Sequence, residues 1–336
     1  MSTLFSRAAA RTSNTSFSFY LPPTSKYLHA AAPLADALTI AGPKGPAAIR
    51  KLRDEGFASA VLFDGVGYGG RDLPPAAVWV EEQRRAGADR ELLPGVFLPW
   101  DKEDFTTAST LISSEAMVAR DLGASMVIAV DARWVGKRTE ELTDMLRGTG
   151  APVAMILAAG GDPLAVRGAV RGLRWLATRV PNLSVLRCDH GAIGAVTFGA
   201  VHAAIGLTTG NRHFATSGMR PHKLADPTAR LFLRNLLDWF RAGDVAGWAA
   251  AGADITCPLP GCDGHSLARF LDRDNDAVLH NLHALADFAD WIIGAEPEER
   301  AATFMTECRD AAQRYGLAGF KGPEEPKPQL TGWALL

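Results

Sequence analysis

The chain has 336 residues, of which 47% are hydrophobic and 21% are charged, and its formal net charge at pH 7 is −2. This length and composition are enough for one large domain with an appendage. The nearly balanced charge excludes a global positive field for nucleic acid but not a local basic patch. No apolar run reaches the ~18–20 residues that a membrane-spanning helix needs, so we expect no membrane partner.

The N-terminal segment differs in composition from the rest of the chain. Its first sixteen residues are rich in Ser, Thr, Arg and Ala and contain no acidic residue. We interpret residues 1–18 as a disordered tail, with a transit peptide as the alternative. Four cysteines are too few for a disulfide framework in a chain of this length, so we expect a reducing, cytoplasmic location.

Short apolar runs rich in β-branched residues alternate with amphipathic segments through the next part of the chain. The alternation of strands and helices is typical of parallel α/β sheets. Eight such units favour an α/β fold of the (β/α)8 TIM-barrel type, which we assign to residues 19–256. A doubly wound open sheet is the alternative, but no glycine-rich dinucleotide loop and no P-loop is present. The predicted strands are residues 38–41, 59–64, 95–99, 125–131, 152–158, 183–189, 204–209 and 253–256.

The remaining residues predict an appendage. Residues 257–320 read as a zinc-binding helical subdomain with helices at 279–293 and 297–315. Residues 321–336 read as an extended tail, because prolines and lysines alternate with acids at its start.

Three acids end predicted strands, which is where barrel enzymes place their reacting groups. They are Asp64, Asp131 and Asp189. Carboxylates that meet at one barrel mouth suit acid–base or nucleophilic chemistry on a glycosidic bond. The alternative is that each acid caps the helix that follows it.

Other residues near these acids are candidates for substrate binding. Glycines such as Gly67 let the backbone approach a ligand closely. Tyr68 and Trp134 can stack on a base, unless they belong to the core. Basic residues that follow the predicted strands can form a phosphate-binding rim or an ordinary solvated surface. The rim candidates are Lys137, Arg138, Arg212, His213, Arg220, His222 and Lys223, and Arg187 and His190 beside Asp189 are further substrate-binding candidates.

The most informative segment begins after residue 256. Two cysteines separated by four residues and a later histidine form a plausible zinc set, namely Cys257, Cys262 and His280. His265 is the preferred fourth ligand, with Asp263 and His283 as alternatives. Four protein ligands leave no open position, so we expect a structural Zn²⁺. Free cysteines and solvated histidines are the alternative interpretation.

These residues resemble the zinc segment of the tRNA-guanine transglycosylase superfamily. The resemblance rests on three motifs: Cys-Pro-Leu-Pro-Gly-Cys at 257–262, Ser-Leu-Ala-Arg-Phe at 266–270 and His-Asn-Leu at 280–282. The Asp-Gly-Val-Gly-Tyr at 64–68 is similar to the loop in which the family's aspartate acts at the reacting base. Asp131 resembles its base-recognising aspartate, and Ala159-Gly160-Gly161 resembles its Gln-Gly-Gly. The resemblance is scattered over residues 20–293.

The chain departs from the family at several functional positions. Leu259 stands where the family has a middle cysteine, and Ala159 stands where it has the glutamine that reads guanine. The family's nucleophilic aspartate has no clear counterpart, since Cys257 aligns with it. The chain therefore resembles the superfamily's DNA-acting branches more than its tRNA-acting members.

We expect a nucleic-acid N-glycosidase, most of all a DNA glycosylase that removes a hypermodified base in anti-phage defence. Water is the simpler acceptor once the nucleophile is lost. Base exchange in tRNA with 7-deazaguanine substrates is the first alternative, and a non-catalytic nucleic-acid-binding subunit is the second. The expected partner is DNA ahead of tRNA, and a homodimer is left open.

Overall fold

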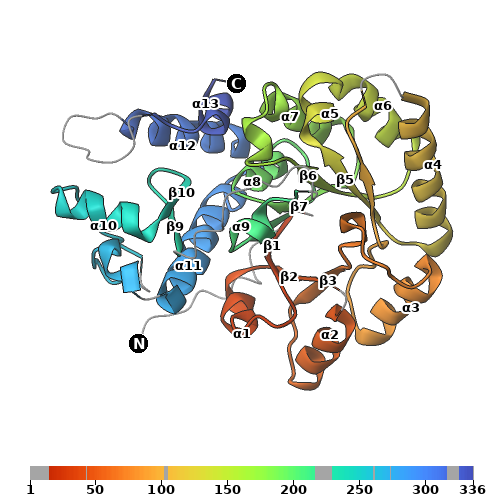
Figure 1. The fold of residues 1–336 in the computed structure, drawn as a ribbon, viewed down its shortest axis with the longest axis horizontal. Coiled ribbons are helices and arrows are strands. Elements are labelled where there is room, and N and C mark those ends of the chain that lie inside the picture. The colour runs from red at the N-terminus through yellow and green to blue at the C-terminus, as the bar shows by residue number, and fades with distance from the viewer. Residues whose placement is uncertain are drawn as a thin grey trace.

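The computed structural model describes residues 15–42, 44–101, 105–215, 229–259, 262–272, 274–315 and 325–335. Its centre is an eight-stranded parallel sheet in the order β3-β2-β1-β8-β7-β6-β5-β4. The helices lie outside the strands, as Figure 1 shows, so the architecture is that of a (β/α)8 barrel. The strands are β1 (Ser16–Leu21), β2 (Ala37–Ala41), β3 (Ala60–Asp64), β4 (Val96–Leu98), β5 (Met126–Asp131), β6 (Val153–Ala158), β7 (Leu183–Cys188) and β8 (His202–Gly206).

The first and last strands of the barrel differ from the prediction. β1 lies between β2 and β8, although residues 16–18 were assigned to a disordered tail. The prediction of a last strand at 253–256 was wrong, because that segment forms only one isolated bridge, Thr256 to Ser266. Ile255 is its one large apolar side chain, and Gly252 before it has a φ of +92°. The barrel therefore begins at Ser16, and β8 is its last strand.

The barrel is joined between β3 and β4 by residues 89–94. The backbone N–H of Asp89 donates to the carbonyl of Val61 at 2.9 Å, and that of Gly67 donates to the carbonyl of Pro94 at 2.9 Å. A Cβ at Gly67 would lie 2.5 Å from the same Pro94 oxygen, so this close approach requires glycine there.

The strands are buried on both faces, which explains their nearly continuous apolar sequences. Small and branched side chains fill the barrel interior, among them Val127, Ala129, Ile156 and Ala204. The helices around the barrel are α1 (Leu28–Ala31), α2 (Gly45–Asp54), α3 (Ala76–Ala86), α4 (Phe105–Leu122), α5 (Ala132–Lys137), α6 (Thr139–Gly148), α7 (Ala169–Arg179), α8 (Gly191–Thr197) and α9 (Thr209–Arg212).

A C-terminal group of elements packs on one side of the barrel, opposite α2, α3 and α4 in Figure 1. It contains the antiparallel hairpin of β9 (Arg230–Leu233) and β10 (Asp238–Arg241). The predicted helices correspond to α11 (Asp274–Ile293) and α12 (Arg300–Arg314), and α10 (Ala242–Ala250) precedes them. Both α11 and α12 contact α8 of the barrel.

The end of the chain is not extended as predicted. Pro328–Ala334 form helix α13, which packs against α7 and α12. Trp333 in this helix is fully buried and stacks on Phe198 at a ring distance of 5.9 Å. Burial of this indole side chain outweighs the prolines of the segment that precedes it.

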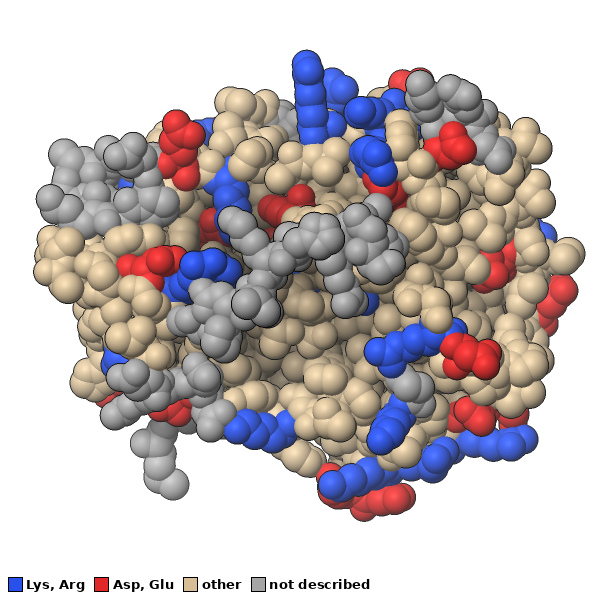
Figure 2. All heavy atoms as spheres, viewed as in Figure 1, with Lys and Arg blue, Asp and Glu red and all other residues tan. Residues whose placement is uncertain are grey.

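Among the helices of the described residues, none is long and apolar enough to span a bilayer. Lys and Arg are interspersed with Asp and Glu over the face seen in Figure 2. This mixture agrees with the net charge of −2.

Candidate functional site

Asp64 lies at the C-terminal end of β3 and is fully buried. Its Oδ2 accepts hydrogen bonds from the hydroxyls of Tyr20 at 2.5 Å and Tyr68 at 2.8 Å. Its Oδ1 accepts from the backbone N–H of Val66 at 2.8 Å. Such short O–H···O⁻ contacts are charge-assisted, and the three donors fix the orientation of the carboxylate.

The two tyrosines act as donors in this group. Burial, followed by the nearby Asp64, raises the pKa of both Tyr20 and Tyr68, so both hydroxyls stay protonated. The ring of Tyr68 packs edge-on against Phe214 at 4.8 Å between ring centroids. Tyr68 is therefore placed beside Asp64 as predicted, but it is only 4% exposed and needs movement of Phe214 to stack on a base.

Arg187 reaches this group because β7 contains a β-bulge. The register against β8 shifts between Val185 and Cys188, and Arg187 has a left-handed φ of +53°. Its Nη1 donates to the Tyr68 hydroxyl at 3.3 Å, while its Nε and Nη2 donate to the carbonyl of Gly210. Bulges re-aim side chains next to functional sites, and a left-handed residue other than glycine costs about 1–3 kcal/mol. The fold thus accepts strain to put a guanidinium over Tyr68.

Two predicted residues lie away from this group. Asp131 caps α5: its Oδ1 accepts from the N–H of Arg133 at 2.9 Å, and both carboxylate oxygens bind the Arg133 guanidinium. Trp134 is fully buried, and its indole N–H donates to the carbonyl of Pro99 at 2.8 Å. Asp131 is therefore engaged as a helix cap, and Trp134 has no face free for stacking.

The loop after β6 lies beside Phe214. The N–H of Ala159 donates to the carbonyl of Phe214 at 3.0 Å, and Gly160 is exposed. Gly67 was predicted to let a ligand approach its backbone, but the carbonyl of Pro94 occupies that position and accepts from the Gly67 N–H. Ala159 and Gly160 are thus at the mouth of the barrel, whereas Gly67 has a structural role.

A second polar group surrounds Asp189, just beyond the end of β7. Asp189 Oδ1 accepts from the N–H of Gly191 at 3.0 Å, and Oδ2 accepts from the amide of Gln329 in α13 at 2.8 Å. Asp189 Oδ2 also lies 3.9 Å from His213 Nε2. Asp162 completes the group, since one ligand atom from each of Asp162, Asp189 and His213 lies within 4.8 Å of the others. Burial, then the charge of Asp189, raises the pKa of Asp162 to about 7.

Several buried atoms of this group have no hydrogen-bond partner among the described residues. They are Asp162 Oδ2, both ring nitrogens of His190, Arg212 Nε, His213 Nε2 and Gln329 Oε1. His190 is 1% exposed, and its Nδ1 lies 3.9 Å from Asp189 Oδ1. Unpaired buried polar atoms are rare, so this density of them marks a place where water or another polar ligand binds.

Arg212 does not form the exposed phosphate rim that was predicted. It is 2% exposed, donates to the carbonyl of Leu207 at 3.0 Å and lies 3.5 Å over the ring of Trp239. Burial lowers its pKa to about 9. Of the other rim candidates, Lys137 and Arg138 lie at the end of α5, and Arg220, His222 and Lys223 lie outside the described residues.

The Asp64 and Asp189 groups are neighbours at the mouth. Arg187, which binds Tyr68, is two residues from Asp189 on the same strand end. Phe214, which packs on Tyr68, directly follows His213. Both connections place residues of the two groups next to each other along the chain.

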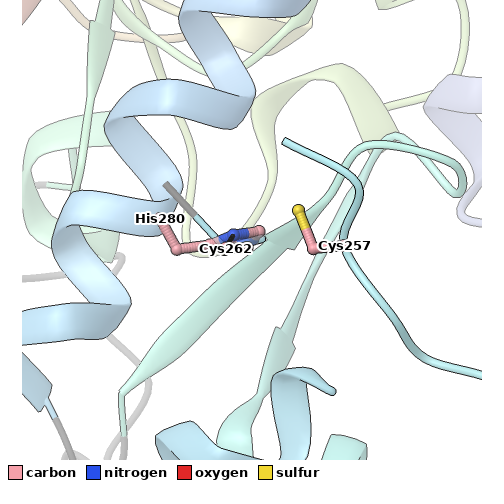
Figure 3. A group of neighbouring side chains, drawn as sticks. All are labelled: Cys257, Cys262 and His280. Atoms are coloured by element: carbon pink, nitrogen blue, oxygen red, sulfur yellow. Dashed lines mark hydrogen bonds between the residues drawn. The ribbon is translucent and has the colours of Figure 1, made fainter. Parts of the chain in front are cut away.

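A third group lies beneath the hairpin. Cys257, Cys262 and His280 are buried, and their ligand atoms lie within 4.8 Å of one another. Figure 3 shows the three side chains converging from the 257–262 segment and from α11. Cys262 Sγ lies 3.2 Å from His280 Nδ1. These residues are placed to bind a metal ion, as predicted from their spacing.

The surroundings of His280 prepare it as a ligand. Its Nε2 lies 2.9 Å from the carbonyl of Phe232 and so carries the proton, which leaves Nδ1 free towards Cys262. Asn281 continues the contact with β9, since its amide accepts from the N–H of Phe232 and donates to the carbonyl of Arg230. The His-Asn-Leu motif therefore joins the metal group to the hairpin.

His265, the predicted fourth ligand, is not part of this group. It is exposed, and it lines a cavity of about 610 Å³ together with His280 and His283. Burial, then Cys257, raises the pKa of the Cys262 thiol to about 12, so its thiolate form needs a neighbouring cation.

Sequence reasoning missed four residues of the site, namely Tyr20, Asp162, Phe214 and Gln329. Tyr20 lies in β1, a strand that the sequence analysis did not predict. Gln329 lies in the segment that was predicted to be an extended tail. Phe214 follows the predicted Arg212 and His213 but carries no motif of its own. A signal existed only for Asp162, which the sequence marks as a cap before Pro163 and which does accept from the N–H of Leu164.

No protein-family model matches this chain, and no curated protein matches it. One similar solved structure is a xylose isomerase-like TIM barrel/4-hydroxyphenylpyruvate dioxygenase fusion protein, with 14% identity and a TM-score of 0.39. The match covers 64% of this chain and 40% of that one, so this chain spans less than half of the fusion protein.

Two further solved structures are similar to this chain at low identity. A mutant tryptophan synthase alpha-subunit from Pyrococcus furiosus has 15% identity and a TM-score of 0.37, over 57% of this chain and 86% of that one. A 3-hexulose-6-phosphate synthase has 18% identity and a TM-score of 0.34, over 57% of this chain and 90% of that one. The barrel assignment rests on the strand order described above.

Proposed function

We propose that this protein cleaves the bond between a nucleobase and its sugar in nucleic acid, with DNA that carries a hypermodified base as the preferred substrate. One observation carries the proposal: the buried Asp64 carboxylate is held by two tyrosine hydroxyls beside Arg187 at the catalytic end of a barrel. The resemblance of the 64–68 loop to tRNA-guanine transglycosylases supports the same chemistry.

Asp64 is the catalytic carboxylate in this proposal. Cleavage of an N-glycosidic bond develops positive charge on the sugar, and a carboxylate of fixed orientation stabilises that charge without reorganising. Tyr20 and Tyr68 supply the orientation through their hydrogen bonds to Oδ2.

Arg187 and Phe214 are the substrate-binding residues beside Asp64. A guanidinium can contact a phosphate or a base carbonyl and can stack on a base. The target nucleotide would leave the base stack to reach the barrel mouth. Displacement of Phe214 from the Tyr68 ring then opens two aromatic faces, and Ala159 leaves room for a large base substituent.

Water is the acceptor in this proposal. Residues 202–214, which form β8 and the segment after it, contain no Asp or Glu. This strand end therefore offers no carboxylate for the covalent sugar–enzyme intermediate that base exchange needs. Hydrolysis requires no such intermediate.

We infer that the ion held by Cys257, Cys262 and His280 is Zn²⁺, for which thiolate and imidazole are the preferred ligands. Its role is structural: it fastens the 257–262 segment and the β9–β10 hairpin to α11. The group lies in the C-terminal elements and shares no residue with the Asp64 and Asp189 groups.

The test is base release by the full chain. Phage DNA with hypermodified bases, unmodified DNA and total tRNA are each incubated with the protein, and free bases are measured by mass spectrometry. Asp64→Asn is expected to lose base release by roughly 100-fold or more while it keeps its fold and zinc. The matched control, Asp54→Asn, changes an exposed acid at the end of α2 and should release base like the wild type. Full activity in Asp64→Asn would remove Asp64 from the mechanism.

A non-catalytic nucleic-acid-binding subunit is the second candidate. The complete burial of Asp64 and the acid-free end of β8 favour it. It predicts salt-dependent nucleic-acid binding without base release from any of the three substrates. Incorporation of labelled guanine into tRNA would instead indicate the transglycosylase reaction.

A further inference from the structure

We propose that Asp162, Asp189 and His213 bind one divalent cation at the barrel mouth, and that this cation activates the water that attacks the sugar. The cation site stands on the geometry alone, whereas its catalytic use rests on the proposed glycosidase function. No motif in the sequence points to this site.

The distances suit an ion better than hydrogen bonds. Asp189 Oδ2 and His213 Nε2 are 3.9 Å apart, which is too long for a hydrogen bond. Two ligands of one ion, each at about 2.1 Å, lie about 3 to 4.2 Å apart. One carboxylate oxygen of Asp162 lies within 4.8 Å of both ligand atoms, close to this range.

Hydrogen bonds orient the two carboxylates, and each still has an acceptor site for an ion, because a carboxylate oxygen can accept more than one contact. Asp162 uses Oδ1 to accept from the N–H of Leu164, and its buried Oδ2 has no partner among the described residues. Gln329 donates to Asp189 Oδ2 at 2.8 Å and holds that carboxylate in place. Hydrogen bonds of this kind from outside the ligand set are typical of metal sites.

Buried groups beside the three ligands independently indicate a bound ligand. His190 is 1% exposed, and neither of its ring nitrogens has a partner among the described residues, although Nδ1 points to Asp189 Oδ1 at 3.9 Å. Gln329, also 1% exposed, has an unpartnered Oε1 beside the same carboxylate. Waters on a hydrated cation would satisfy these atoms.

The local charges leave a place for a cation. Arg212 donates to the carbonyl of Leu207 and to Thr209 Oγ1, and so does not bridge the two carboxylates. Lys327 is bound to Asp238. The side chain of His213 is 19% exposed, whereas its Nε2, which faces Asp189, is buried. Two carboxylates and one imidazole suit a first-row ion such as Mn²⁺, Fe²⁺ or Zn²⁺.

The end of β8 has no carboxylate that could activate water, and such an ion would take over that role. It lowers the pKa of a bound water and so generates hydroxide. The hydroxide oxygen bonds to the anomeric carbon, and the carbon–nitrogen bond breaks with its electron pair on the base. The base nitrogen takes up the proton that the water lost, so the products are the free base and the sugar hydroxyl. Arg187 and Phe214 join this site to Asp64.

The experiment counts metal ions per full-length chain. The ions retained after purification are measured by inductively coupled plasma mass spectrometry, and Mn²⁺ taken up on titration is measured by electron paramagnetic resonance. The retained ions and the Mn²⁺ taken up are predicted to total two per chain in the wild type, one of them at the cysteine site. In Asp162→Asn and in His213→Gln the total is predicted to be one. Asn at 162 keeps the Oδ1 cap, so this variant should fold, and Asp54→Asn is the matched control with two ions.

The outcomes separate the two proposals. Equal sums for the wild type and both variants would overturn the cation site. Base release that does not depend on the second ion would overturn its catalytic use and leave the proposed function intact. Two ions without base release would leave the cation site intact and contradict the glycosidase.

Discussion

His202 provides a test of how the barrel closes. It lies at the start of β8, is 1% exposed, and its two ring nitrogens contact β1: Nδ1 lies 2.7 Å from Ser16 Oγ and Nε2 lies 2.9 Å from Ser18 Oγ. Burial, with a smaller contribution from Arg90, lowers its pKa from 6.5 to about 3. The folded chain therefore keeps this histidine neutral at pH values where the unfolded chain protonates it.

The sign and size of the effect follow from proton linkage. Between about pH 6.5 and 3 the unfolded state binds one more proton than the folded state at His202, so the free energy of unfolding falls as the pH falls. From pH 7 to pH 5 the loss from this one group is about 2 kcal/mol. The stabilisation that the neutral His202 contributes is complete above about pH 6.5, the pKa of this histidine in the unfolded chain.

The assay is urea unfolding followed by tryptophan fluorescence at pH 7 and pH 5. His202→Gln removes the titrating group, so the wild type should lose about 2 kcal/mol more than this variant over that interval. His265→Gln, at an exposed histidine, is the matched control and should lose as much as the wild type. Equal losses in the wild type and His202→Gln would refute the reasoning.

Three further predictions concern the site and the packing. Tyr68→Phe removes one of the hydroxyl donors to Asp64, worth about 1.5–3 kcal/mol, and should slow base release roughly 10- to 150-fold in the mass-spectrometric assay. His280→Ala removes a metal ligand and should lower the bound zinc by one ion per chain, together with the melting temperature. Gly172→Ala puts a Cβ 1.8 Å from a backbone oxygen of α5 and should cost about 1–3 kcal/mol in urea unfolding, whereas Gly148→Ala, with open space around its Cβ, should gain about 0.5–1 kcal/mol.

Each of these predictions has a contradicting result. Tyr68→Phe with wild-type rates would show that the hydroxyl does not act on the carboxylate. Zinc content unaffected by His280→Ala would place the ion elsewhere. Equal stability of Gly172→Ala and Gly148→Ala would contradict the close approach of α5 and α7.

Most of the barrel could be predicted from the sequence because its strands are buried on both faces. The runs in β2 to β8 are almost wholly apolar, and helical segments separate them. β1 was missed because Ser16 and Ser18 alternate with phenylalanines at the end of a Ser-rich and Thr-rich tail. The serines are needed there to bind His202, and this requirement appears only once β1 and β8 are paired.

The candidate site could be predicted only where the contacts are local. Asp64 and Tyr68 lie four residues apart in one loop, and their contact follows from that spacing. Arg187 depends on a bulge, and Gln329 reaches Asp189 across 140 residues. Neither contact leaves a mark in a single sequence. Asp131 shows the opposite case, because Arg133 two residues later was a visible local partner.

The metal group shows both limits. The spacing of Cys257 and Cys262 and the later His280 identified three buried side chains that converge. His265 is closer in sequence to the cysteines than His280, yet it points to solvent. Proximity along the chain was the wrong criterion for the fourth ligand, since helix α11 and the hairpin decide which side chains face the cysteines.

The measurement that tests the central claim most directly is base release in water labelled with oxygen-18. Phage DNA with hypermodified bases is incubated with the full chain, and the small molecules and the remaining DNA are analysed by mass spectrometry. We predict free modified base and oxygen-18 on the sugar from which the base was lost. Absence of free base from this DNA, from unmodified DNA and from tRNA would contradict the assignment of an N-glycosidase.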